Sequence, residues 1–169
     1  LRLAMAPWRR APAGMSLRLV DIARLPHYNE DEETSPAESV LSFRESIARS
    51  DGVIFITPEY NRSIPGVLKN AIDQGSRPKG ASLWSGRPAG VIGSSPGALG
   101  SCMAQHRLRN VLAAHDMRTM GQPEAFLQLG ASDIDAGGEL IDASKGQFVQ
   151  HWIESFGTWQ RHMRDLRCA

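Results

Sequence analysis

Apolar positions along the chain alternate between a strand-like and a helix-like spacing. Residues 53–57, Val-Ile-Phe-Ile-Thr, form a continuous β-branched and aromatic run, of the kind that is buried on both faces of a parallel sheet. Residues 89–93 form a second short apolar run, and residues 16–22 and 118–120 are further strand candidates. We therefore predict a central strand at 53–57 with other strands beside it.

Helical spacing follows the predicted strands. Ser35 can cap a helix whose first position is Pro36, because proline suits the first turn. Pro65 begins a second helix that Gly75 ends, and a third passes through residues 108–112. A last helix carries one apolar face, which its spacing places in the core or at an interface. That face consists of Phe148, Trp152, Phe156, Trp159 and Met163.

This alternation predicts an α/β fold with an open parallel sheet and helices on both faces. The 169 residues are enough for one domain with a single core, so we take residues 1–169 as one domain. In such sheets ligands bind beyond the carboxyl ends of the strands, where loops lead into helix N-termini. Two loops meet this condition, at residues 58–64 and 94–100.

The composition of the chain limits the kinds of molecule that the protein is expected to bind. The formal net charge is +1, from 19 basic and 18 acidic residues, and this leaves no surplus for a nucleic-acid backbone or an anionic membrane. No stretch approaches the roughly 20 apolar residues of a membrane span. Cys102 and Cys168 form neither a disulfide framework nor a metal-ligand spacing. We expect a cytoplasmic protein whose partners are small molecules or copies of itself.

Metal and targeting motifs are not predicted. The five histidines form no ligand pair. Residues 133–138 resemble the start of a calcium loop, but the twelfth position is Ser144 instead of glutamate, so we predict a hairpin or surface turn there. Residues 1–20 are arginine-rich like a transit peptide, but Pro7 and Pro12 interrupt an amphipathic helix.

The loop of residues 58–64 holds polar groups between two prolines, which fix the backbone at its ends. The carboxylate of Glu59, the ring of Tyr60 and the amide of Asn61 suit a planar heteroaromatic ligand. Such a ligand needs hydrogen bonds at its edges and packing on its face. An ordinary turn with satisfied side chains has the same composition, and spacing leaves both interpretations open.

A longer motif distinguishes them. Residues 57–73, TPEYNRSIPGVLKNAID, with Ser76-Arg77-Pro78 after them, resemble the signature of the NADPH-dependent FMN reductases, a flavodoxin-like family that includes quinone, chromate and azo-dye reductases. Residues 93–97 are similar to that family's second flavin-side loop. The resemblance implies a flavodoxin-like fold and FMN-binding residues, whose contacts in the first loop run largely through the backbone. These residues are Pro58, Glu59, Tyr60, Asn61 and Ser94.

The resemblance also implies an activity. NADPH or NADH would stack over FMN and pass hydride to it, and a quinone-like or other small electron acceptor would then take the same place. The flavin carries this chemistry, so no catalytic side chain is assigned. The family implies a homodimer or homotetramer. Three arginines are candidates for the phosphates of the nicotinamide cofactor, namely Arg62, Arg77 and Arg87.

The resemblance is incomplete at the front of the chain. Members of the family open with a strand and a loop of the type Gly-Ser-x-Arg-x-x-Ser-x-Asn, which holds the FMN phosphate at a helix N-terminus. Nothing here matches that loop, and residues 1–6 resemble the helix after it. We expect the first strand and the phosphate loop to be absent from these residues. The alternative function is a non-catalytic flavodoxin-like binding or electron-transfer protein with an incomplete FMN site.

A serine hydrolase is a rival of another class, because residues 93–97 match G-x-S-x-G between a strand and a helix, with Ser95 as nucleophile. The residue after the nucleophile is Pro96, which lacks the N–H that the oxyanion hole requires. Losing one such donor costs about 3 kcal/mol, so this reading is the weaker one. Its acid and base would be Asp116 or Asp133 and His151 or His162.

Overall fold

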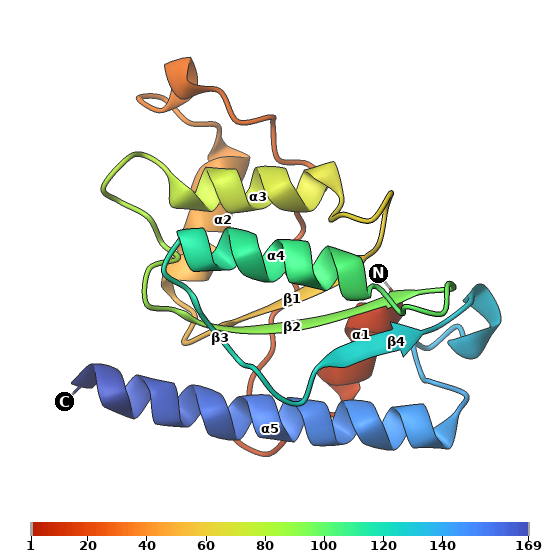
Figure 1. Ribbon diagram of the computed structural model, residues 1–169. Helices are drawn as coiled ribbons and strands as arrows, with labels where there is room; N and C mark the ends of the chain where they lie inside the picture. Colours follow the sequence, from red (N-terminus) through yellow and green to blue (C-terminus); the bar gives the residue numbers. More distant parts are fainter. Residues whose placement is uncertain (1, 169) are drawn as a thin grey trace.

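The computed structural model describes residues 2–168 and shows an open, fully parallel sheet (Figure 1). Its central strand, β2, pairs with β1 on one edge and with β3 and β4 on the other. β3 lies beside residues 88–89 of β2, and β4 lies beside residues 92–95. The strands are β1 (Val53–Pro58), β2 (Pro88–Ser95), β3 (Arg118–Thr119) and β4 (Ala125–Gln128).

Helices cover both faces of this sheet. Two of them lie on one face and three on the other (Figure 1). The first pair is α1 (Arg2–Arg9) and α5 (Ala143–Cys168), and the others are α2 (Glu38–Ala48), α3 (Gly66–Ser76) and α4 (Cys102–Ala114). Two short 3-10 turns are Glu30–Glu32 and Ala131–Asp133. The predicted α/β sheet with helices on both faces is confirmed.

Alternating strand residues supply the two sides of the core. Phe55 and Val91 belong to the cluster on the α2–α3–α4 side, whereas Ile92 belongs to the cluster beneath α5. Because successive side chains on a strand point to opposite faces, a continuous apolar run is required in both β1 and β2. Each such buried side chain stabilises the fold by roughly 1.5–3 kcal/mol. The predicted central position of residues 53–57 is wrong, because in the described sheet β2 is the central strand and β1 lies at the edge.

Helix α5 carries the predicted apolar face. Trp152 and Phe156 are buried, with ring centroids 5.9 Å apart and nearly parallel planes. Phe148 and Trp159 pack against the same cluster while remaining partly exposed, and Met163 is half-buried. The four-residue and three-residue spacing therefore identified the side of the helix that covers the sheet.

The predicted strand at residues 16–22 is wrong. This segment makes no strand pairing, and Figure 1 shows it crossing from the α5 side toward the α2–α3 side. Leu17 packs on the α5-side cluster, whereas Val20 and Ile22 pack on the opposite one. Its apolar side chains pack first on one core cluster and then on the other. The alternation of apolar residues therefore comes from the segment crossing between the two clusters and not from pairing in the sheet.

The start of α2 also differs from the prediction. The helix begins at Glu38 with Ala37 as its N-cap, and no side chain caps it. Ser35 instead donates its backbone N–H to the carbonyl of Glu32, which closes the preceding 3-10 turn. Pro36 follows directly, and a residue before proline is disfavoured in helical conformation.

Candidate functional site

The two loops predicted to bind a ligand emerge side by side. Strand β1 ends at Pro58 and leads into α3, while β2 ends at Ser95 and leads into α4. In the register of the pair, Pro58 lies opposite Ser94 and Thr57 lies opposite Gly93. Because parallel strands share one carboxyl edge, the structure brings the predicted residues of both loops to one end of the sheet.

The first loop forms a tight hairpin. Tyr60 and Ser63 exchange two backbone hydrogen bonds of 2.9 Å each. Between them, Asn61 and Arg62 have φ values of 50° and 61°, as a two-residue I′ turn requires. Left-handed backbone at non-glycine residues costs about 1–3 kcal/mol each and gathers at functional sites. The Tyr60 side chain is 61% exposed, so its ring is available to a ligand or a partner.

The Glu59 side chain is directed toward α4. Its Oε2 accepts a hydrogen bond of 3.1 Å from the backbone N–H of Ala104, in the first turn of α4. The side chain is half-buried. The structure therefore commits the carboxylate of Glu59 to α4, while the backbone of the loop remains at the carboxyl edge of the sheet.

The second loop approaches the first closely at Gly93. A Cβ atom there would lie 2.3 Å from the carbonyl oxygen of Thr57 and 2.5 Å from the hydroxyl of Ser101, so only glycine fits. Ser95 accepts a hydrogen bond from the backbone N–H of Gly97, which holds the loop in a turn. Ser94 is half-buried.

A buried amide fixes the start of α4. Gln105 is fully buried, and its Nε2 donates to the Ser101 hydroxyl at 3.0 Å and to the Ala125 carbonyl at 2.8 Å. Its Oε1 has no hydrogen-bond partner. The sequence held one signal for this residue, because Gln105 shares the helical face of Leu108 and Leu112. Sequence reasoning missed it.

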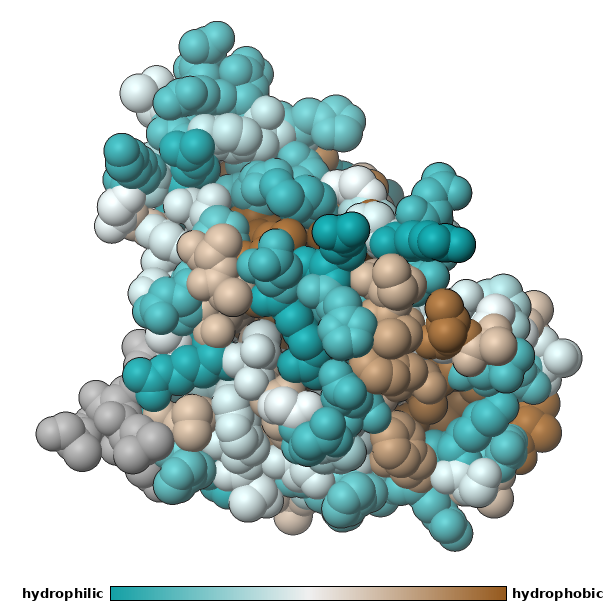
Figure 2. Space-filling view, in the orientation of Figure 1, coloured by the Kyte–Doolittle hydropathy of each residue, from teal (hydrophilic) through white to brown (hydrophobic). Residues whose placement is uncertain are grey.

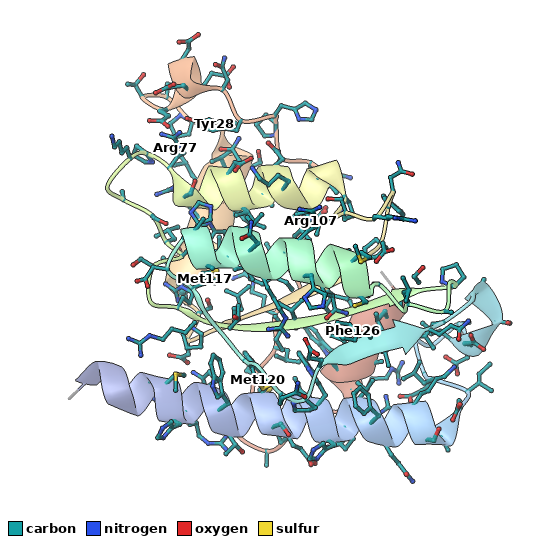
Figure 3. All side chains as sticks on the ribbon, viewed as in Figure 1. Tyr28, Arg77, Arg107, Met117, Met120 and Phe126 are labelled. Atoms are coloured by element: carbon teal, nitrogen blue, oxygen red, sulfur yellow. The ribbon has the colours of Figure 1, made fainter. Side chains whose placement is uncertain are left out.

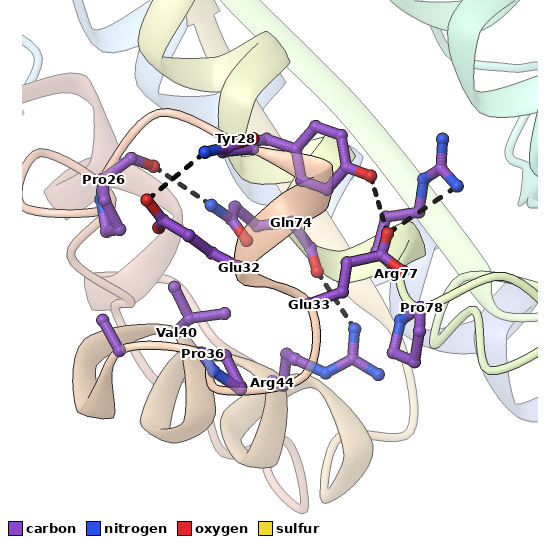
Figure 4. Close-up of a pocket in the computed structure, with 12 residues that line it drawn as sticks. Pro26, Tyr28, Glu32, Glu33, Pro36, Val40, Arg44, Gln74, Arg77 and Pro78 are labelled. Atoms are coloured by element: carbon purple, nitrogen blue, oxygen red, sulfur yellow. Dashed lines mark hydrogen bonds and ion pairs between the residues drawn. The ribbon is translucent and has the colours of Figure 1, made fainter.

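Two hollows of the surface lie away from the two loops at the carboxyl edge of the sheet. One of about 40 Å³ is lined by residues of the 26–37 segment, α2 and the end of α3 (Figure 4). A broader depression of about 310 Å³ adjoins it near Arg77 and His115. Figure 3 shows Tyr28 and Arg77 at this end of the molecule, away from Phe126 on β4. We place the candidate site at the two loops, because the residues predicted from the sequence come to this one edge and the Tyr60 ring is exposed there.

Three side chains form a compact group beside those hollows (Figure 4). The Tyr28 hydroxyl donates to Glu33 at 2.6 Å, and Arg77 lies 3.7 Å from the same carboxylate. The Arg77 guanidinium also stands 5.2 Å from the centroid of the Tyr28 ring. The hydrogen bond to Glu33 is the main cause that raises the pKa of Tyr28 to about 12.

The three candidate arginines are not brought together. Arg62 is carried at the tip of the hairpin and is exposed. Arg77 lies beyond the end of α3. Arg87 donates to the carbonyls of Leu83 and Ser50, just before β2 begins. Of the three, only Arg62 belongs to the loops at the carboxyl edge.

The hydrolase triad is not assembled either. Asp116 follows α4 and accepts a hydrogen bond of 3.0 Å from Ser85, so it lies at the opposite end of that helix from Ser95. Asp133 accepts a 2.7 Å bond from the backbone N–H of Gly130. His151 and His162 are both exposed on α5. These positions give no support to the hydrolase interpretation.

The surface around the loops is mixed in character. Figure 2 shows tan and brown atoms gathered over β4 and the right-hand edge, where the strands end, and teal atoms over the 29–37 segment. Leu99, in the second loop, is 62% exposed.

Residues 133–140 form the predicted hairpin, with an antiparallel bridge between Ile134 and Leu140.

Neither a metal site nor a membrane-crossing helix is present in the described residues. Within residues 2–168, no three histidine, cysteine or carboxylate side chains are grouped closely enough to hold a metal ion. In the same part of the chain, no helix is both long enough and apolar enough to cross a membrane.

Comparison with known proteins gives consistent matches. The model of the NADPH-dependent FMN reductase family matches residues 2–131. A quinone reductase from Pseudomonas putida is 47% identical over 159 residues, covering 94% of this chain and 85% of that protein. A 2-hydroxy-1,4-benzoquinone reductase from Burkholderia sp is 42% identical over 163 residues, covering 96% and 89%. The structure of FerB, an NAD(P)H:(acceptor) oxidoreductase flavoenzyme from Paracoccus denitrificans, matches with TM-score 0.90 at 41% identity, covering 96% and 89%.

Proposed function

The chain belongs to the NADPH-dependent FMN reductase family, and from this we propose that it is an FMN-dependent NAD(P)H oxidoreductase that reduces quinone-like acceptors. One observation carries the proposal. In the register of β1 and β2, Pro58 lies opposite Ser94, and the strained hairpin with the exposed Tyr60 ring begins two residues later. Relatives named as quinone reductases support the class of acceptor.

The residues at this edge fit the ring of FMN. Tyr60 offers an aromatic face, whereas the Ser94 hydroxyl, the Asn61 amide and the loop backbone offer hydrogen bonds for ring edges. Bound FMN would supply the hydride chemistry between NAD(P)H and the acceptor. Pro58, Glu59, Tyr60, Asn61 and Ser94 would hold and orient the ring.

The charged end of the cofactor requires a different partner. Figure 1 shows the start of α1 toward the end of the sheet at which the two loops emerge, although α1 packs on the α5 face, and helix N-termini favour phosphate groups. We propose that Arg62, which is exposed at the tip of the hairpin, meets the phosphates of the nicotinamide cofactor. We therefore assign the ring to the loops and propose the start of α1 for the FMN phosphate.

The proposal also covers the oligomeric state and the cellular location of the protein. We propose a cytoplasmic homodimer or homotetramer with the flavin edge near a subunit contact. Support comes from the exposed apolar groups Tyr60, Val67 and Leu99 around the two loops, since exposed apolar patches mark contact sites. Light scattering on the eluting protein should give a mass of two or four chains, and a mass of one chain would contradict this part.

The function is tested with the purified protein. We expect FMN to bind with a visible flavin spectrum and quenched fluorescence, and NADPH or NADH to be oxidised when a benzoquinone is added. Flavin uptake without NAD(P)H oxidation would favour a non-catalytic electron-transfer protein. If the purified protein neither takes up FMN nor oxidises NAD(P)H, the proposal is overturned.

A further inference from the structure

Glu59 joins two segments that the sequence separates by 45 positions. It follows directly after β1, yet its carboxylate accepts the backbone N–H of Ala104 at 3.1 Å in α4. We propose that Glu59 is a positioning residue of the flavin site, whose carboxylate fixes the spacing between the hairpin and the second loop. This inference rests on the proposed function and adds to it a role for one side chain.

The start of α4 needs such a partner. The first N–H groups of a helix have no acceptor within it, and they carry partial positive charge. Ser101, the N-cap of α4, has φ of 72° and makes no capping bond through its side chain, and the first turn contains no acidic residue. Glu59 therefore supplies, from another element, the negative charge that a capping residue would usually provide.

A second anchor makes α4 a fixed reference. Gln105, one residue after Ala104, ties this turn to β4 through the carbonyl of Ala125 at 2.8 Å. Because that amide is fully buried, the first turn of α4 is held to the sheet independently of the hairpin. Glu59 then attaches the hairpin to this fixed turn.

The hairpin itself requires an anchor. Asn61 and Arg62 occupy left-handed conformations, which persist only when surrounding structure over-determines them. Val67, just beyond the loop, is 49% exposed and Tyr60 is 61% exposed, so packing contributes little at the tip. The bond from Glu59 to α4 is the polar contact that joins this loop to the helix of its neighbour.

Three variants test the role through FMN affinity, measured by fluorescence titration. Glu59→Ala should weaken FMN binding about tenfold, equivalent to about 1.4 kcal/mol. Glu59→Gln should restore the dissociation constant to within about threefold of wild type, because its amide oxygen still accepts the Ala104 N–H. Glu45→Gln, at an exposed position of α2, is the matched control and should bind like wild type. Wild-type affinity in Glu59→Ala would overturn the proposal.

The midpoint potential of bound flavin separates positioning from direct contact. If the carboxylate serves α4, Glu59→Gln should leave the potential unchanged, because the lost charge faces the helix N-terminus and not the ring. A shift in Glu59→Gln as large as that in Glu59→Ala would show that the carboxylate acts on the flavin itself, and this would overturn the positioning role.

Hydrogen exchange keeps this test separate from the proposed function. Without flavin, Glu59→Ala should speed exchange at the Ala104 amide, whereas Glu45→Gln should not. Unchanged exchange at Ala104, in a protein whose wild type binds FMN, would refute the role of Glu59 alone. A wild type that binds no flavin and oxidises no NAD(P)H would refute the proposed function, whatever the exchange result.

Discussion

Tyr28 is one of two tyrosines in the chain, and its hydroxyl is held by Glu33 at 2.6 Å. This bond favours the neutral phenol and raises its pKa to about 12. Because the folded-state pKa lies above the ordinary tyrosine value of about 10, the stabilisation is complete below about pH 10 and declines as the pH rises toward 12.

Ultraviolet titration of tyrosinate checks this value. In a Tyr60→Phe background only Tyr28 titrates, and we expect its ionisation near pH 12. Glu33→Gln should lower the apparent pKa, because it removes the charge and weakens the acceptor. The same titration curve with and without Glu33→Gln would contradict the assigned cause.

Tyr60 tests the ring site at the level of one side chain. Its ring is 61% exposed, so Tyr60→Ala should leave the melting temperature almost unchanged. Loss of an aromatic contact with the flavin, worth about 0.5–1.5 kcal/mol, should raise the FMN dissociation constant several-fold. Fluorescence titration measures this, and unchanged affinity would remove Tyr60 from the site.

Individual residues also show where sequence reasoning stops. The motif at residues 57–73 predicts Tyr60 and Asn61 as site residues through its resemblance to the family signature, since composition alone leaves an ordinary turn open. It did not reveal that the Glu59 side chain serves α4, since its partner lies 45 positions away. A contact of that range depends on how the elements pack, which local spacing does not encode.

Among the elements, α3 depends on a close contact at its end. The sequence predicts that Gly75 stops the helix, but α3 continues to Ser76. A Cβ at position 75 would lie 2.2 Å from the Trp84 ring, which is buried and donates to the Ile72 carbonyl at 2.7 Å. Glycine is therefore required here for packing.

Gly75→Ala should lower the free energy of unfolding by about 1–3 kcal/mol, the range for overpacking a core. Gly66→Ala is the matched control in the same helix, because nothing lies within 4 Å of its added Cβ. It should change stability by less than about 0.5 kcal/mol. Urea denaturation of both variants gives the comparison, and equal effects would contradict the packing argument.

Strands with both faces buried were the most predictable elements. Residues 53–57 and 89–93 lie within β1 and β2, and their runs were recognisable because a strand covered by helices on both faces must be apolar throughout. Strand β4 was not predicted, since Ala125–Gln128 is only four residues long. The segment at 16–22 gave a false strand, because its apolar residues divide between the two core layers.

At the scale of the whole molecule, parallel topology creates the candidate site. The register of β1 and β2 sets Pro58 beside Ser94, so two loops separated in sequence meet at one edge. That meeting could be anticipated, because the carboxyl ends of parallel strands always share an edge. The anchoring of the start of α4 could not be anticipated from the sequence. Glu59 and Gln105 hold this turn, and through it the two loops are connected.

The most direct test is anaerobic mixing of NADPH with the FMN-loaded protein, followed by a benzoquinone. The chain is a flavin-dependent oxidoreductase of this family, so NADPH should bleach the visible absorbance of the bound flavin. Addition of the quinone should restore that absorbance without oxygen. Absorbance that stays unchanged after NADPH is added to protein with bound FMN would contradict the account.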